Sequence, residues 1–178
     1  MTTPTITRER LEKRFRLWDA NHDGLIDRSD FETEASQLVR AFGEHENSPR
    51  ASQVHSAFGQ LWDYLAEKVG PGTTSMTLDQ FEKVSLQEII IPGDAGFSKV
   101  LRPMIQAVAA LCDTNGDNRI DPSEFGKWLR AIKADPAQAD SLFRDVDANG
   151  DGYLSIDELV GAIQAYHEGK LDVSLLGA

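Results

Sequence analysis

The chain has 178 residues, of which 40% are hydrophobic and 26% charged, and its formal net charge is −11. These values predict an ordinary globular protein and exclude a disordered chain. The acidic balance argues against nucleic acid as a partner, because phosphate binding requires concentrated Lys and Arg.

Membrane spanning and a disulfide framework are also not expected. The longest uninterrupted apolar run, 107–112, is too short to cross a bilayer, and the first residues lack the apolar core of a secretory signal. Cys112 is the single cysteine, so no internal disulfide can form. We therefore expect a cytoplasmic protein with no membrane partner.

Four helix–loop–helix units follow one another along the chain. Apolar residues at helical spacing flank three acidic segments, 19–30, 113–124 and 147–158. A fourth copy lies between the first two, where predicted helices flank the turn 69–80, which is rich in Gly, Pro and Thr. Aligning Phe81 with Phe31 and Phe125 places Met76 where the acidic segments carry aliphatic residues, namely Ile26, Ile120 and Leu154.

Linkers are expected at 43–49, 92–96 and 134–136, where turn-forming residues cluster. Pro103 is expected either to open the last part of the helix before the second acidic segment or to kink it. The tail after Gly169 loses helical periodicity but keeps Leu171, Val173, Leu175 and Leu176, so it should dock on the body.

The acidic segments match the twelve-residue loop of an EF-hand. Ca²⁺ takes six to eight oxygens, and such a loop supplies side chains at positions 1, 3 and 5, a carbonyl at 7, a direct or water-mediated ligand at 9 and a bidentate carboxylate at 12. Position 6 must turn sharply, and an aliphatic residue at position 8 is expected to link paired loops by a short β-bridge. Three such matches in one chain leave little room for acidic surface turns as an explanation.

Each acidic loop supplies a predicted set of ligands. In the first loop the set is Asp19, Asn21, Asp23, the carbonyl of Leu25, and Asp30, with Asp27 at position 9. In the loop from Asp113 it is Asp113, Asn115, Asp117, the carbonyl of Arg119, and Glu124, with Asp121 at position 9. In the last loop it is Asp147, Asn149, Asp151, the carbonyl of Tyr153, and Glu158, with Ser155 at position 9.

Two positions depart from the usual pattern. Asn118 stands where glycine is expected at position 6, and asparagine is among the few other residues that accept a left-handed backbone. Asp30 closes the first loop in place of glutamate and is one methylene shorter. We therefore expect Mg²⁺ to compete with Ca²⁺, especially at this first site, because Mg²⁺ is smaller and prefers octahedral coordination.

The turn 69–80 is not expected to bind metal. Val69, Pro71, Thr73 and Gln80 occupy positions 1, 3, 5 and 12, and its first carboxylate, Asp79, falls at position 11. The turn should keep its place by pairing with the first loop.

With these loops in place, the sequence resembles the calerythrin branch of the sarcoplasmic calcium-binding protein family. The resemblance covers nearly the whole chain, including RLEKRFRLWD, AFGQLWDYLAEKVG and GKLDVSLLG. It implies an all-α fold of two EF-hand pairs in one compact body, with two or three working sites at the ligand positions named above. We expect an N-terminal pair in 1–92, with a degenerate second hand, and a C-terminal pair plus tail in 93–178.

The expected function is Ca²⁺ buffering or transport through three sites, without catalysis and as a monomer. Sensors expose Met-rich grooves, whereas this chain has three Met against eight Phe and three Trp. A Ca²⁺ sensor with a protein partner is the alternative hypothesis. A photoprotein or luciferin-binding protein is a third, in which Trp18, Trp62, Trp128, Tyr166 and His167 would line a ligand cavity; an aromatic core explains these residues more simply.

Overall fold

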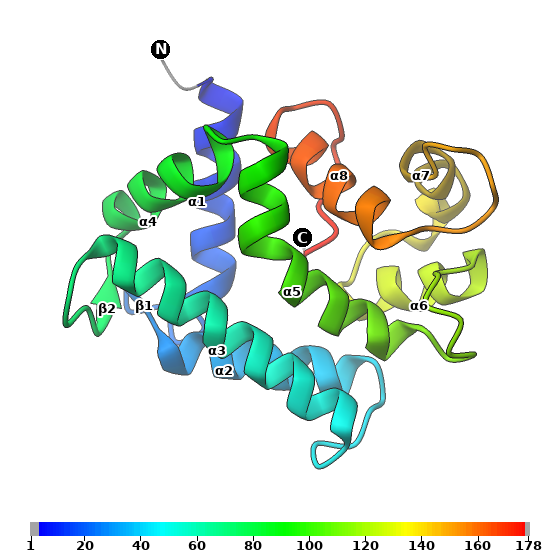
Figure 1. The fold of residues 1–178 in the computed structure, drawn as a ribbon, viewed down its shortest axis with the longest axis horizontal. Coiled ribbons are helices and arrows are strands. Elements are labelled where there is room, and N and C mark those ends of the chain that lie inside the picture. Colours follow the sequence, from blue (N-terminus) through cyan, green and yellow to red (C-terminus); the bar gives the residue numbers. More distant parts are fainter. Residues whose placement is uncertain (1–3, 177–178) are drawn as a thin grey trace.

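The computed structural model describes residues 4–176 and contains ten helical segments in that range. The first half has α1 (Thr5–Trp18), α2 (Arg28–Ala41), α3 (Pro49–Val69) and α4 (Leu78–Ser85), which continues as the π-helical turn η1 (Leu86–Ile90). The second half has α5 (Asp94–Cys112), α6 (Pro122–Ala131), the 3₁₀ turn η2 (Pro136–Gln138), α7 (Ala139–Val146) and α8 (Ile156–His167). Each of the four predicted loops joins one pair of these helices (Figure 1). The predicted all-α EF-hand fold is confirmed.

The loops are joined in pairs through position 8. Strand β1 (Ile26–Asp27) pairs antiparallel with β2 (Ser75–Met76), and Ile26 lies opposite Met76. In the second half, Ile120 and Leu154 exchange two backbone hydrogen bonds, of 3.0 and 2.8 Å. The predicted β-bridges are therefore present, and the alignment that placed Met76 at position 8 is confirmed.

One hydrophobic core runs through both halves. Helix α3 lies along α5 (Figure 1), and the buried side chains of all eight α-helices belong to one cluster. Trp18 and Phe31 pack with tilted rings whose centroids are 4.8 Å apart in the first half, and Phe125 and Phe143 lie 5.6 Å apart in the second. Phe42 meets Trp128 across the two halves at 6.3 Å. The aromatic residues therefore fill the core and connect its two parts.

Helix α5 begins nine residues before Pro103, so the proline does not open the helix. Figure 1 shows α5 changing direction partway along its length, the effect expected of a proline inside a helix. The alternative in which Pro103 opens the last part of the helix is therefore wrong, because α5 continues through Pro103 to Cys112.

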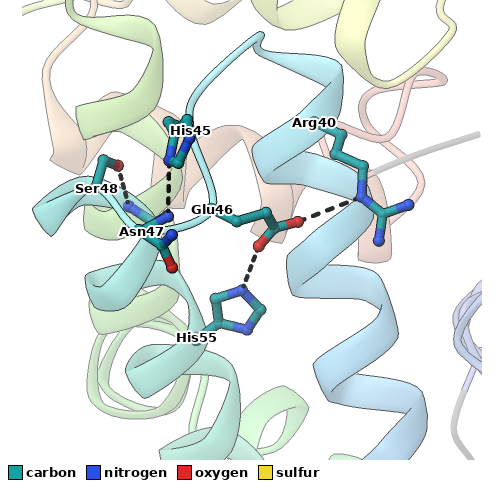
Figure 2. A network of polar contacts seen from close by, with 7 residues as sticks. Arg40, His45, Glu46, Asn47, Ser48 and His55 are labelled. Atoms are coloured by element: carbon teal, nitrogen blue, oxygen red, sulfur yellow. Dashed lines mark hydrogen bonds and ion pairs between the residues drawn. The ribbon is translucent and has the colours of Figure 1, made fainter.

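The linker between α2 and α3 is ordered by its own polar side chains (Figure 2). Glu46 accepts a hydrogen bond from Arg40 at 3.3 Å and contacts His55 at 3.2 Å, so it connects the two helices. His45 Nδ1 instead accepts from the Asn47 amide at 3.2 Å. His45 and His55 therefore have different partners, both within the linker region.

The C-terminal tail docks on the body, as expected, and the structure shows that it contacts both halves. Leu175 is 1% exposed, and its carbonyl accepts a hydrogen bond of 2.9 Å from the indole of Trp128 in α6. Arg14 of α1 donates to the Leu176 carbonyl at 2.6 Å and to the Ser174 hydroxyl at 2.5 Å. The tail thus joins α1 to α6. The last two residues, 177 and 178, lie outside the described part of the chain.

Candidate metal-binding loops

The carboxylate at position 1 organises each acidic loop from inside. Asp19 accepts hydrogen bonds from the amides of Asp23 and Gly24, at 3.1 and 2.9 Å. The equivalent aspartates make the same contact with position 6 in the other two acidic loops, Asp113 with Asn118 at 2.9 Å and Asp147 with Gly152 at 3.0 Å. Their second bond comes from the amide at position 4, Gly116 at 2.7 Å and Gly150 at 2.9 Å, in place of position 5. The loop backbone therefore wraps around this side chain.

The side chains at positions 3 and 5 each brace the chain two residues ahead. Asn21 accepts from the Asp23 amide and Asp23 from the Leu25 amide, both at 2.9 Å. The same two bonds recur at 2.9 Å in the loops 113–124 and 147–158. Three segments far apart in sequence therefore have the same local geometry at the predicted ligand positions.

Left-handed backbone occurs at two positions of each acidic loop. At position 6, Gly24, Asn118 and Gly152 have φ of 82°, 61° and 84°. Asn118 thus adopts the predicted conformation. Position 4 is also left-handed, and in the first loop it is occupied by His22, with φ of 60°. We did not predict this turn, although glycine at position 4 of the other two acidic loops, Gly116 and Gly150, is a signal that could have revealed it.

Positions 9 and 12 start the helix that leaves each loop. Asp121 caps α6 by accepting from the Glu124 amide at 2.8 Å, while Glu124 accepts from the Asp121 amide at 3.0 Å. Asp27 with Asp30 and Ser155 with Glu158 form the same reciprocal capping box. The capping box therefore holds the position-12 side chain at the loop through protein hydrogen bonds alone.

The second oxygen at position 12 reaches back to the start of the loop. Glu124 Oε1 accepts from the Thr114 amide at 2.9 Å, beside Asp113. Asp30 makes the corresponding contact with the Ala20 amide at 3.1 Å, in spite of its shorter side chain. In the last loop Glu158 contacts the Asn149 amide at 3.3 Å. Position 12 thus closes all three loops.

Charge provides the test of whether these loops suit a cation. Asp19, Asp30, Asp113 and Glu124 are between 2% and 7% exposed. No ion pair within residues 4–176 includes any of the predicted ligand carboxylates. Burial raises the pKa of Asp30 above its usual value, and the charges of Asp27 and Asp19 add to this effect. The hydrogen bonds that Asp30 accepts from the backbone amides of Asp27 and Ala20 lower the pKa, but by less. Buried carboxylates without a basic partner favour a bound metal cation, so the donor set fits Ca²⁺.

The loops differ from a ready-made cluster of acidic groups. Within residues 4–176, no three Asp, Glu, His or Cys side chains converge closely enough to enclose an ion. Position 3 is asparagine and position 7 a carbonyl in all three acidic loops, and the oxygens at positions 1 and 12 hydrogen bond with loop amides. The fifteen predicted ligands remain a prediction, supported by their common arrangement.

The turn 69–80 keeps the frame of a loop without its charges. Thr77 and Gln80 form the capping box of α4, with bonds of 2.9 and 3.3 Å. The turn is organised by Thr73, whose hydroxyl donates to the Gly70 carbonyl at 2.7 Å. Asp79 is exposed on the first turn of α4. The turn therefore offers no internal carboxylate to a cation.

A side-chain contact between loops was not foreseen. The guanidinium of Arg119 lies 4.1 Å from the centre of the Tyr153 ring. Both residues occupy position 7, where the sequence suggested only a backbone carbonyl. The pairing of Ile120 with Leu154 places them side by side, and the cation–π contact adds to the β-bridge.

Known protein families match the same segments of the chain. The family model described as an EF-hand domain pair matches residues 105–164, and an EF-hand model matches 11–33. Calerythrin from Saccharopolyspora erythraea is 42% identical over 176 residues, covering 98% of this chain and 99% of calerythrin. A solved calcium-binding protein of Streptomyces coelicolor is 26% identical with a TM-score of 0.72, over 90% of this chain and 97% of that one.

Calcium-loaded apo-aequorin from Aequorea victoria is also similar in fold, with a TM-score of 0.74 over 92% of this chain and 91% of that chain, at 16% identity. The near-complete match to calerythrin, together with the paired loops, identifies the family. The chain belongs to the calerythrin-like family of EF-hand calcium-binding proteins.

Proposed function

We propose that the protein is a calcium buffer or transporter that binds three Ca²⁺, in the loops 19–30, 113–124 and 147–158. One observation carries this proposal. All three loops share one arrangement of carboxylates at positions 1, 5 and 12, and none of these carboxylates has a cationic partner in the described residues. A divalent ion supplies the missing charge at each loop.

The consequence of binding is a change in charge and stability. Three Ca²⁺ would move the formal net charge from −11 to −5, since −11 + 6 = −5. A site saturated at a hundred times its dissociation constant contributes about 2.7 kcal/mol of stability. Calcium is therefore expected to raise the melting temperature, through relief of repulsion within the loops, without changing the number of subunits from one.

The closed core supports a buffer rather than a sensor. Met76 and Met104 are 0% and 1% exposed, so neither provides the adaptable methionine surface that sensors use. Within residues 4–176, the exposed large apolar residues are Ile6 and Leu17 of α1, Leu25 of the first loop and Ile91 after η1. A sensor remains the second candidate, since the Streptomyces relative is described in terms of calcium-mediated regulation.

Binding of a hydrophobic dye to the intact chain, with Ca²⁺ and with chelator, separates these two functions. A buffer should give little or no increase in fluorescence with Ca²⁺, because its apolar surface stays covered. A large increase with unchanged helix content would contradict the buffer proposal and favour a sensor with a protein partner.

The first site is proposed to be less selective against Mg²⁺. Asp30 accepts hydrogen bonds from the Ala20 and Asp27 amides at 3.1 and 2.8 Å. Because its side chain is one methylene shorter than that of glutamate, bidentate closure requires the loop to contract, which would suit the smaller ion. Calorimetric titration of Asp30→Glu with Ca²⁺, with and without Mg²⁺, tests this. The substitution should strengthen Ca²⁺ binding and weaken Mg²⁺ competition; unchanged values for both would contradict it.

Of the five residues that would line a luciferin cavity, only Trp18 and His167 border the internal space between α1 and α8. Trp62 and Trp128 are 4% and 0% exposed, and Trp128 hydrogen bonds with the docked tail. Light emission after addition of coelenterazine and Ca²⁺ would contradict the buffer proposal.

We further propose a non-enzymatic, cytoplasmic protein. Among the helices of residues 4–176, none is long and apolar enough to cross a bilayer.

A further inference from the structure

Three buried polar atoms lack a protein partner in the part of the chain that the structure describes. They are Arg14 Nε, Ser85 Oγ and His167 Nδ1. Their residues are 4%, 1% and 5% exposed, so bulk solvent does not reach them. Leaving such a group without a hydrogen bond is unfavourable, so three of them need a physical explanation.

All three residues line the same internal space. It lies among α1, α3, α4, α5 and α8, and its other walls are apolar, including Leu65 and Phe81. Leu176 of the docked tail forms a further part of the wall. Apart from Trp18, the remaining lining residues have apolar side chains, and the Trp18 indole makes no hydrogen bond with any of the three atoms.

The size of the space decides what it can hold. About 20 Å³ is open to the centre of a water molecule. One buried water needs about 10–15 Å³ measured in this way and two to four polar partners. The space is therefore large enough for one water and too small for an organic ligand.

The chemistry of the three atoms also fits water. Arg14 Nε donates one hydrogen bond, and the Ser85 hydroxyl can donate or accept. Burial, reinforced by the charges of Arg14 and Arg10, lowers the pKa of His167 to about 3, so its ring is neutral and Nδ1 can accept or donate according to the tautomer. Water can donate two bonds and accept two, which matches this mixed set.

The backbone around the space is unusual as well. Ser85 ends α4 and immediately precedes the π-helical turn η1, whose Ile89 and Ile90 also line the space. Such turns are rare and occur often at functional sites. The wide turn and the unpartnered atoms therefore meet at one place in the fold.

From this geometry we propose that one ordered water occupies the space and bridges Arg14, Ser85 and His167. The three partners belong to the helix entering the first hand, the helix leaving the second and the helix leaving the fourth. The water thus links the two halves of the molecule at their junction.

A crystal structure of the full chain with Ca²⁺ tests the proposal directly. A water is expected within hydrogen-bonding distance, about 2.7–3.2 Å, of at least two of the three atoms. An empty space, an ion such as chloride in it, or rotated side chains that give the three atoms protein partners would overturn the proposal.

Magnetic relaxation dispersion of the water signal, which counts long-lived bound waters, provides a second test. Ser85→Val replaces the hydroxyl with methyl groups that fill the space, and should remove one long-lived water. Ser52→Val is the matched control on the exposed face of α3 and should remove none. Equal counts in Ser85→Val and the unsubstituted chain would overturn the proposal. If Ser85→Val does not fold, the crystal structure of the unsubstituted chain decides.

Discussion

The first and second halves of the molecule use the same scaffold with different numbers of charges. The loop pairs are joined by the same antiparallel contact at position 8, Ile26 with Met76 and Ile120 with Leu154. Thr77 and Gln80 start α4 with the capping box that Asp121 and Glu124 use for α6. Pairing and helix initiation therefore survive where the ligands are lost, so scaffold and metal site are separable properties of a hand.

The largest effect is expected when the scaffold is broken without touching a ligand. Met76 is fully buried opposite Ile26, and Met76→Ala leaves a cavity there. Such a truncation costs about 2–5 kcal/mol of unfolding free energy, and it should also weaken Ca²⁺ binding in the first loop. Denaturant unfolding and calcium titration measure both effects.

Thr74→Ala, in the same turn but exposed, is the control and should change neither quantity. If Met76→Ala left the first site unaltered, the second hand would have no role in supporting it.

The converse change removes a predicted ligand and keeps the scaffold. In Glu158→Gln the side chain can still cap α8, as Gln80 caps α4, so stability in chelator should change little. The stabilisation by Ca²⁺ should fall by about 2.7 kcal/mol at a hundredfold excess over the dissociation constant. Melting curves with and without Ca²⁺ measure the difference.

Asp157→Asn makes the same charge change at position 11, where the side chain faces Arg102 and not the loop centre. It should retain the full Ca²⁺ effect. Equal losses in both variants would mean that total charge, and not ligation, controls the stabilisation.

A smaller effect is expected at the junction of the two halves. Arg14→Met removes the hydrogen bonds to Ser174 and Leu176 that hold the tail, and bonds of this charged type contribute about 1.5–3 kcal/mol. Thermal unfolding should show the loss, and proteolysis should reach the tail sooner. Arg16→Met on the exposed side of α1 is the control. A variant as stable as the unsubstituted chain would mean that burying the guanidinium costs as much as its bonds contribute.

The smallest effect concerns the backbone of the loop 113–124. Asn118 has φ of 61°, a conformation that glycine adopts without steric cost. Asn118→Gly should therefore strengthen Ca²⁺ binding at this site by no more than about 1 kcal/mol. Calorimetry can resolve this change; weaker binding would show that the asparagine side chain itself supports the loop.

The sequence was sufficient for the features that depend on local spacing. Positions 1 to 12 of each loop, the alignment of Met76 with Ile26 and the left-handed Asn118 follow from short-range rules, and the structure confirms the latter two. Ligation of Ca²⁺ at the predicted residues remains a prediction, although their common hydrogen bonding agrees with it.

The features that sequence reasoning missed depend on contacts between distant segments. The tail's hydrogen bonds with Arg14 and Trp128 join residues 47 to 162 positions apart, and no local pattern encodes them. The space beside Ser85 depends on how five helices pack. The left-handed His22 is an exception, because it is a local feature that the glycines at position 4 of the other two acidic loops indicate.

Calcium stoichiometry tests the central claim most directly. Equilibrium dialysis of the full chain should find three tightly bound Ca²⁺, and the double variant Glu124→Gln/Glu158→Gln should retain only the one in the loop 19–30. Four ions, no ions, or three ions in the double variant would contradict the separation between a shared scaffold and three charged loops.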